Sequence, residues 1–431
     1  REVSQPSTLR GGFGSASGPR LSPTLVVMSE PLVTIRAGVP WLNKALHREL
    51  RFSPPPHDPA ILVTFDGAPP PSPTRPWPGR RVLILRDVEL PRARKPFAQG
   101  GARADEVHCY QDFTPPAGLS GDRETASAQS AAEFLRRSNV RRVVADRTLP
   151  LIYSHYMKDA GIEVVCDPAM GQLDRRRKDD QEIEFLRKAQ AVTEDAIRMA
   201  CEFIASCQAG KGGVLIDRAS SHSAPLTSER VKSLVDEFLM ERGFSNPGHI
   251  VAGGPQGSDC HHAGRGELRT LEPIIIDVFP CDMATLYNGD CTRMVVHGRE
   301  GDIPEPVRHM HRAVVDAKAA ALRATRAGVT GEFVHQAAID VIRARGYGTD
   351  EPSVHGPGGM PHGTGHGIGL DLKEPPLLDM KGPELLAGDA VTIEPGVYKD
   401  GLGGMRIEDM VIVTPDGCMN LNKLPEGLTW R

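Results

Sequence analysis

Four acidic residues in the carboxy-terminal half of the chain stand at the ends of apolar, strand-like runs, and no other feature constrains the fold as strongly. Asp277 ends the run Ile274-Ile275-Ile276, where a solvated acid does not normally lie, and Asp290 follows thirteen positions later, before a second strand-like run. A buried carboxylate needs a partner, and a cation is the obvious one. A hairpin between the two runs would place both carboxylates side by side on adjacent strands.

A second pair of acids repeats this pattern. Glu394 ends the run 390–393 just before a turn, Glu408 follows the run 405–407, and His366 lies between glycines. Each acid alone is also compatible with an edge strand or a turn, but together with the histidine they predict a metal site. Carboxylates with a single imidazole suit Mn²⁺, Co²⁺, Fe²⁺ or Zn²⁺. Four carboxylates carry enough charge for two such ions, which can lower the pKa of a shared water.

Composition excludes several classes of protein. The 51 lysines and arginines stand against 55 aspartates and glutamates, so the formal charge of −4 gives no basic field for nucleic acid or an anionic membrane surface. No run approaches the roughly 18 to 20 apolar residues that cross a bilayer. The eight cysteines contain no Cys-x-x-Cys arrangement and are typical of reduced, buried thiols in a cytosolic enzyme. We therefore expect a soluble, cytoplasmic protein with neither nucleic acid nor membrane as a partner.

The 431 residues are too many for one ordinary core and predict two or three domains. Residues 1–27 are rich in Ser, Gly, Pro and Arg and are expected to form a disordered leader. Residues 28–173 alternate strand-like with helix-like segments, which predicts a small α/β domain. Its strand-like runs are 60–65, 81–85, 142–145 and 162–166, and its helix-like segments are 41–50 and 124–137.

Residues 174–431 are predicted to form a second, α+β domain. The charged stretch 174–180 has the composition of a linker, and it leads into a long amphipathic pattern from 181 to 207. The glycine-rich stretch 356–369 lacks the Gly-Lys-Ser/Thr ending of a phosphate loop, which argues against a phosphate site. Further helices are predicted at 228–241, 304–325 and 330–345, and strands at 273–279, 294–296, 390–394 and 405–413.

Five segments of this second domain closely resemble the creatinase, aminopeptidase P and prolidase family, both in their order along the chain and in their amino-acid sequence. They are Ile276-Asp277, 289–293 (GDCTR), 362–376 (HGTGHGIGLDLKEPP), 392–398 (TIEPGVY) and 406–409 (RIED). The resemblance extends over residues 174 to 420, and an amino-terminal α/β domain with a charged linker is also the family's arrangement. It implies a pita-bread fold for the carboxy-terminal domain, a creatinase-like amino-terminal domain, a homodimer and a dinuclear metal centre.

The resemblance also implies a role for each of the five metal-binding candidates. Asp277 would bind one metal ion, Asp290 and Glu408 would bridge both ions, and His366 would be the lone imidazole ligand. Glu394 would bind metal and also shuttle a proton as a catalytic residue. The family uses a further histidine, upstream of the first aspartate, near the carbonyl oxygen of the scissile bond.

Three more positions are candidates for contacts with substrate. For the upstream histidine, the spacing to the glycines favours His261 over His262, although a loop histidine facing water is the alternative for either. His362 resembles a histidine near the substrate, and Arg406 resembles an arginine close to the bridging carboxylate and the far end of the substrate. Packing or ion pairing is the alternative for both.

One position departs from the family's pattern. Seven residues after His366, where the family usually has a second catalytic histidine, this chain has Lys373. A lysine there can donate a hydrogen bond to the tetrahedral intermediate or protonate the leaving nitrogen, because nearby dications would lower its pKa. The other interpretation of the same change is altered specificity or reduced activity.

The resemblance implies a peptidase that hydrolyses the bond after the first residue of short peptides with proline second, as an Xaa-Pro aminopeptidase or dipeptidase. Mn²⁺ is the first expectation for the two ions, and Co²⁺, Zn²⁺ or Fe²⁺ are the alternatives. The extra domain and Arg406 disfavour a methionine aminopeptidase, and the full ligand set disfavours a creatinase, which needs no metal. The alternatives from other classes are a non-catalytic or altered-specificity binding protein on the same fold, and an ordinary α/β protein with unrelated surface acids.

Overall fold

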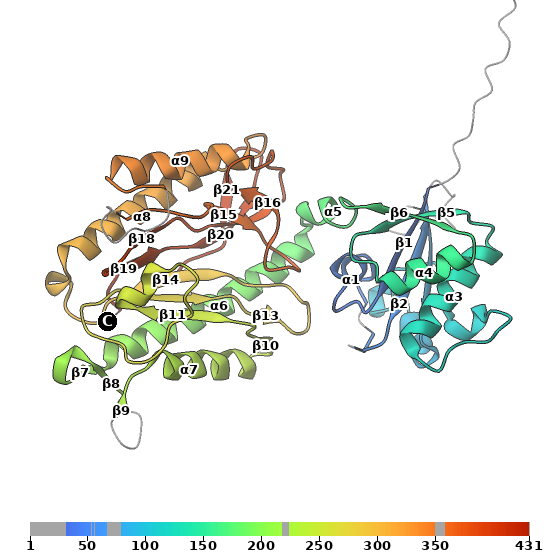
Figure 1. Ribbon diagram of the computed structural model, residues 1–431, viewed down its shortest axis with the longest axis horizontal. Coiled ribbons are helices and arrows are strands. Elements are labelled where there is room, and N and C mark those ends of the chain that lie inside the picture. The colour runs from blue at the N-terminus through green and yellow to red at the C-terminus, as the bar shows by residue number, and fades with distance from the viewer. Residues whose placement is uncertain are drawn as a thin grey trace, which may run out of the picture.

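The computed structural model describes residues 32–430 except positions 53, 56, 67–78, 218–223 and 350–357. The expected disordered leader, residues 1–27, lies outside the described residues. Figure 1 shows two bodies of mixed helix and sheet, with the short helix α5 (Leu173–Arg176) between them. The smaller body comes from the amino-terminal part of the chain and the larger one from the carboxy-terminal part.

A six-stranded mixed sheet forms the smaller body, in the order β4-β3-β2-β1-β5-β6. Alternate residues of its strands face opposite sides, so Ile61 and Val63 pack toward the helices α3 and α4, whereas Leu62 packs toward α1. The order of its elements confirms the alternation of strands and helices that was predicted for this part of the chain. The elements are β1 (Val33–Gly38), α1 (Lys44–Leu50), β2 (Ala60–Phe65), β3 (Arg80–Leu85), α2 (Leu90–Ala93), β4 (Glu106–Cys109), α3 (Arg123–Arg137), β5 (Arg142–Asp146), α4 (Leu151–Asp159) and β6 (Glu163–Asp167).

Buried ion pairs fix the charged stretch predicted as a linker to the larger body. The Arg176 guanidinium donates two hydrogen bonds to Asp389, at 2.9 and 2.6 Å, and Lys178 Nζ lies 2.5 Å from Glu374 Oε1. The helix α6 (Asp180–Ser206) then begins at a capping box, in which the side chains of the N-cap residue Asp179 and of Glu182 bond each other's backbone N–H groups.

Two helix pairs cover the outer faces of the sheets in the larger body. In Figure 1, α8 and α9 lie above the strands, and α6 and α7 lie below them. The main elements after α6 are α7 (Ser228–Glu241), β11 (His249–Gly253), β12 (Ile274–Val278), β14 (Cys291–Val295), α8 (Glu305–Ala324), α9 (Gly331–Ala344), β15 (Gly365–Gly367), β16 (Glu374–Leu378), β17 (Ala390–Ile393), β18 (Gly396–Lys399), β19 (Gly403–Arg406), β20 (Asp409–Val413) and β21 (Cys418–Asn420). Shorter strands are β7 (Gln208–Ala209), β8 (Leu215–Asp217), β9 (Ala224–Pro225), β10 (Phe244–Ser245) and β13 (Cys281–Asp282).

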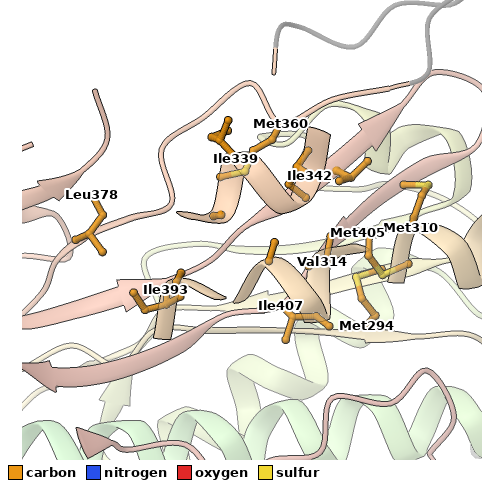
Figure 2. Packing of buried hydrophobic residues seen from close by; sticks show 14 of the residues in the cluster. Met294, Met310, Val314, Ile339, Ile342, Met360, Leu378, Ile393, Met405 and Ile407 are labelled. Carbon is orange, nitrogen blue, oxygen red and sulfur yellow. The ribbon is translucent and has the colours of Figure 1, made fainter. Parts of the chain in front are cut away.

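The strand β12 shows how the layers share one core. Ile274 and Ile276 point to α6 and α7, while Ile275 points to the opposite side and joins the cluster under α8 and α9. Figure 2 shows this second cluster, in which Met310 and Val314 from α8 meet Met405 from β19. The acid Asp277 lies on the same face of β12 as Ile275 because side chains alternate along a strand. The strand therefore points its carboxylate into the space between the sheets.

Most predicted elements of this part are confirmed within one to three residues, but the predicted strand 405–413 is wrong as a single element. The chain forms β19 up to Arg406 and β20 from Asp409, and the two strands belong to different sheets. The break occurs because the backbone N–H of Glu408 donates to Thr292 O at 3.1 Å on β14 rather than continuing either ladder.

The cysteines meet their prediction only in part. All eight are free thiols, as expected, but only Cys201, Cys207 and Cys291 are buried, and Cys166 is exposed. No helix in the part of the chain that the structure describes is long and apolar enough to cross a bilayer.

Candidate active site

A cavity of about 450 Å³ opens between the sheets of the larger body. All nine residues predicted to form the site lie in its wall, although they come from separate strands and loops. They are His261, Asp277, Asp290, His362, His366, Lys373, Glu394, Arg406 and Glu408.

The hairpin predicted between the two aspartates is present. The strands β12 and β14 pair antiparallel with Asp277 opposite Thr292, and Asp290 immediately precedes β14. Asp290 and Thr292 are two residues apart and so share the face of the sheet to which Asp277 points. Both carboxylates are buried, with exposed fractions of 7% for Asp277 and 5% for Asp290.

The turn that carries Asp290 is clamped to the long helix α6. The side chain of Gln190 accepts a hydrogen bond from the backbone N–H of Asp290 at 3.0 Å and donates one to its carbonyl oxygen at 2.7 Å. The preceding residue, Gly289, lies so close to α6 that a Cβ there would collide with the hydroxyl of Thr193. Only glycine lets the chain approach the helix at this point, and this contact fixes the position of the carboxylate.

The opposite wall supplies the histidine and the third carboxylate from β15 and β17. His366 Nδ1 bonds to Gly367 O at 3.0 Å, which requires the proton on Nδ1 and leaves the Nε2 lone pair free. This Nε2 faces Glu394 Oε1 at 3.4 Å and Asp290 Oδ2 at 3.7 Å. Burial lowers the pKa of His366, so the ring is neutral and three acceptors face one another. A cation between them satisfies all three.

The donor set fits a pair of divalent cations. The ligand atoms of Asp290, His366 and Glu408 all lie within 4.8 Å of one another. Asp277 Oδ1 is buried without a hydrogen-bond partner, so this oxygen is available to a metal ion. Burial and then the neighbouring carboxylates raise the pKa of Asp290 and of Glu408 well above their ordinary values. Bound dications would remove this mutual repulsion of the ionised acids.

Arg406 holds the edge of the cluster in a network of hydrogen bonds. Its guanidinium donates to Asp277 Oδ2 at 2.5 Å, to Thr292 Oγ1 at 3.2 Å and to Tyr398 Oη at 2.7 Å. Tyr398 Oη in turn lies 2.9 Å from His362 Nε2, whose Nδ1 donates to a backbone carbonyl. The network ties the predicted substrate residues His362 and Arg406 to the ligand candidate Asp277.

The remaining candidates, His261 and Lys373, reach the cavity from exposed positions. His261 is exposed and lies in the cavity wall, whereas His262 Nδ1 accepts the backbone N–H of Gly264 at 2.9 Å within its own loop. Lys373 is exposed at the cavity, where its charge lowers the pKa of Asp290 less strongly than burial raises it. Of the two upstream histidines, His261 is therefore the one that faces the space between the carboxylates.

Sequence reasoning missed the residues that orient the ligand candidates. Thr292 Oγ1 donates to Glu408 Oε2 at 2.9 Å, Tyr398 lies between Arg406 and His362, and Gln190 holds the turn of Asp290. Thr292 and Tyr398 lie inside the segments that resemble the family, so those segments were the available signal. Gln190 has no such signal, because a buried glutamine on a long helix looks like any polar helix residue.

Comparison with known proteins places this arrangement in a family. The model of metallopeptidase family M24 matches residues 184–415, which is more than half of the chain. The chain belongs to metallopeptidase family M24. Divalent metal ions are a property of this family, in agreement with the donor set of the cavity.

Curated relatives support the same assignment. The M24 chain is 33% identical over 259 residues to the "Probable dipeptidase PepE" of Mycobacterium tuberculosis, a match over 59% of this chain and 60% of that protein. It is 30% identical over 256 residues to the "Xaa-Pro dipeptidase" of Pyrococcus furiosus, over 58% of this chain and 64% of that protein. The matched region thus spans about 60% of the length of these relatives.

Solved structures share the fold along almost the whole chain. An X-Pro aminopeptidase from Thermotoga maritima superposes with a TM-score of 0.70 at 20% identity, over 93% of this M24 chain and 97% of that one. The prolidase from Pyrococcus furiosus gives a TM-score of 0.67 at 21% identity, over 91% of this chain and 96% of that one. The expected pita-bread fold with a preceding amino-terminal domain is therefore confirmed.

Proposed function

We propose that this M24 protein hydrolyses the amino-terminal Xaa-Pro bond of short peptides and needs two divalent cations to do so. The observation that carries the proposal is the convergence of three buried carboxylates, the half-buried carboxylate of Glu394 and one neutral histidine on a single cavity. The names of the relatives support the substrate, because both a dipeptidase and an aminopeptidase for Xaa-Pro bonds share the fold.

In this proposal Asp277, Asp290, His366, Glu394 and Glu408 hold the two ions. When bound, the ions supply a Lewis acid for the scissile carbonyl and a water of lowered pKa. Glu394 accepts the proton of the attacking water, since its carboxylate lies at the cavity beside His366 Nε2. It then passes the proton toward the leaving nitrogen of proline.

The other candidates act on the substrate. His261 and Lys373 reach the cavity from exposed positions, where each can donate a hydrogen bond to the oxygen that gains charge during the attack. His362 lines the cavity where the substrate passes. Arg406 is a positioning residue, because its guanidinium is occupied by Asp277 and Tyr398 and is only 4% exposed.

Metal identity, assembly and location complete the proposal. We expect Mn²⁺ as the native ion, with Co²⁺, Zn²⁺ or Fe²⁺ as alternatives, since oxygen-rich sites with one imidazole accept all four. We expect a homodimer in the cytoplasm, and the eight free cysteines fit a reducing compartment. Neither nucleic acid nor a membrane is an expected partner.

A non-catalytic binding protein on the same fold is the second candidate, and one observation favours it. Lys373 stands where the family usually has a second catalytic histidine. A protein of this kind would bind metal and peptide without turnover.

The test is hydrolysis of Ala-Pro and Ala-Pro-Ala by metal-stripped protein before and after addition of Mn²⁺, Co²⁺ or Zn²⁺. We expect cleavage to return with metal and to be lost in Glu394→Gln, which keeps the shape of the side chain and removes its basicity. Binding of about two ions per chain without cleavage of either peptide would favour the binding protein instead. Failure to bind metal would overturn the proposal.

Lys373 has a test of its own. We expect Lys373→Ala to lower kcat by about a hundredfold with unchanged metal stoichiometry, because loss of one hydrogen-bond donor to the oxygen that gains charge costs roughly 10²- to 10³-fold. Lys373→His is expected to restore part of the rate. Unchanged turnover in Lys373→Ala would remove the lysine from the catalytic residues.

A further inference from the structure

A second cavity, of about 200 Å³, adjoins the metal-binding cavity. His362 and Asp379 line both cavities, so the two spaces meet at these side chains. The wall of the second cavity also includes His335, Ile339 and Arg343 of α9. These three residues are spaced four apart and therefore share one face of the helix.

The charged groups of the second cavity are arranged in order of distance from the junction. At the junction, Asp379 Oδ1 lies 3.7 Å from His335 Nε2, and burial lowers the pKa of this histidine, so the ring offers no positive charge to offset the carboxylate. Two turns further along α9, Arg343 is exposed and donates to the neutral Thr349 Oγ1 at 3.2 Å. Among the residues that the structure describes, no carboxylate forms an ion pair with Arg343.

A peptide that is cut after its first residue needs little room on the amino-terminal side of the scissile bond. On the carboxy-terminal side it needs a path for the rest of the chain. The first residue requires only a pocket, whereas all residues after proline must leave along one path. The second cavity adjoins the first at His362 and Asp379 and is too small for more than a short piece of main chain. Arg406 cannot take the terminal carboxylate of the substrate, because Asp277 and Tyr398 occupy it.

We infer that the second cavity receives the residues after proline and that Arg343 pairs with the terminal carboxylate of the peptide. This inference rests on the proposed function and names its substrate class, which is Xaa-Pro tripeptides and tetrapeptides with a free carboxyl end. The carboxylate of an Xaa-Pro dipeptide would stop near Asp379, where like charges repel. A longer peptide carries its carboxylate past Asp379 to the arginine, which can bond it with two N–H groups.

Binding of the product side tests the inference without catalysis. Titration calorimetry compares Pro-Ala-Ala with its carboxy-terminal amide on Mn²⁺-loaded protein. We expect the free acid to bind about tenfold more tightly, the effect of one charge-assisted hydrogen bond. Arg343→Gln should abolish this difference, whereas the matched control Arg345→Gln should keep it, because Arg345 pairs with Asp316 outside both cavities.

Kinetics provide the second measurement. Arg343→Gln should raise KM about tenfold for Ala-Pro-Ala-Ala at unchanged kcat, and should leave the amidated tetrapeptide and the dipeptide Ala-Pro unaffected. Equal binding of acid and amide by the wild-type protein, or an equal loss for all three substrates in Arg343→Gln, would overturn the inference. If no Xaa-Pro peptide is cleaved, the proposed function fails while the calorimetry still decides the role of Arg343.

Discussion

Each ligand candidate in the cavity is oriented by a neighbour that binds no metal itself. The hydroxyl of Thr292 donates to Glu408 at 2.9 Å and accepts from Arg406 at 3.2 Å, so it fixes two charged groups at once. The carbonyl of Gly367 does the same for His366 by holding its Nδ1 proton. Such outer contacts set the direction of ligand lone pairs, and their loss usually weakens metal binding by about 10- to 100-fold.

Thr292→Val is the sharpest test at this scale, because valine keeps the shape and removes both hydrogen bonds. We expect the affinity for Mn²⁺ to fall about tenfold, since Glu408 loses the donor that orients it. Calorimetric titration of the metal-stripped variant measures the change. Thr114→Val, an exposed substitution in the smaller body, serves as control and should bind metal as the wild type does. Equal affinities in both variants would contradict the orienting role.

The sequence was sufficient to locate the acids and not their supports. Asp277 and Glu394 stand out because a charge at the end of an aliphatic run is rare without a cation. Tyr398 and Thr292 are ordinary strand residues until the fold brings Arg406 between them. Tertiary packing decides which polar groups meet across the sheets. The local sequence pattern does not indicate these contacts.

At the scale of elements, the site depends on how closely one helix approaches one hairpin. The hairpin predicted between the two aspartates is present, and alternation along β12 then sets which residues face α6 and which face the cavity. The division of residues 405–413 into β19 and β20 was not predictable from alternation, because every residue of both strands is buried. It follows from the contact of Glu408 N with Thr292 O on a third strand.

Gly289→Ala tests this helix contact. The added methyl group would collide with Thr193 and the backbone of α6, so the turn must move and the clamp between Gln190 and Asp290 must stretch. We expect the free energy of unfolding to fall by about 1–3 kcal/mol, the usual effect of overpacking, and the affinity for Mn²⁺ to fall with it. Chemical denaturation and calorimetry measure the two changes.

The matched control is Gly301→Ala, where nothing lies within 4 Å of the added methyl group. Its free energy of unfolding should change by less than about 1 kcal/mol. If both alanine variants behave alike, the close approach of the turn to α6 is not what positions Asp290.

At the scale of the whole molecule, buried charges join the two bodies. Arg176 follows the smaller body and bonds Asp389, which is fully buried just before β17, so the pair anchors the linker to the sheet of the site. Arg176→Met would leave the buried Asp389 side chain without its charged partner, and removal of one partner of a buried pair costs about 3–5 kcal/mol. Chemical denaturation of this variant measures the loss.

Two further variants distinguish the effect of breaking the Arg176–Asp389 pair from the general effect of losing an arginine on stability. Arg176→Met combined with Asp389→Leu should recover most of the stability, because two apolar side chains replace two buried charges. Arg308→Met removes a half-buried arginine paired with the exposed Glu305 at 2.9 Å and should cost at most about 1 kcal/mol. A double variant as unstable as the single one would show that the anchor depends on shape rather than charge.

Metal removal should make the stability of the whole molecule depend on pH in a defined direction. In the metal-free protein, burial raises the pKa of Asp277, Asp290 and Glu408. Above about pH 4 the unfolded chain has lost the protons of these acids, whereas the folded protein still holds them. The stability that these acids contribute is therefore lost as pH rises through their raised pKa values. We expect the Tm of metal-stripped protein to fall as pH rises above the ordinary carboxyl range, and Mn²⁺ to raise it most at the higher pH, where the metal no longer displaces protons. Thermal denaturation with and without Mn²⁺ at each pH measures the effect. The difference between the two Tm values removes the contribution of titrating groups outside the site. A difference in Tm that stays constant with pH would mean that these three acids do not share one desolvated centre.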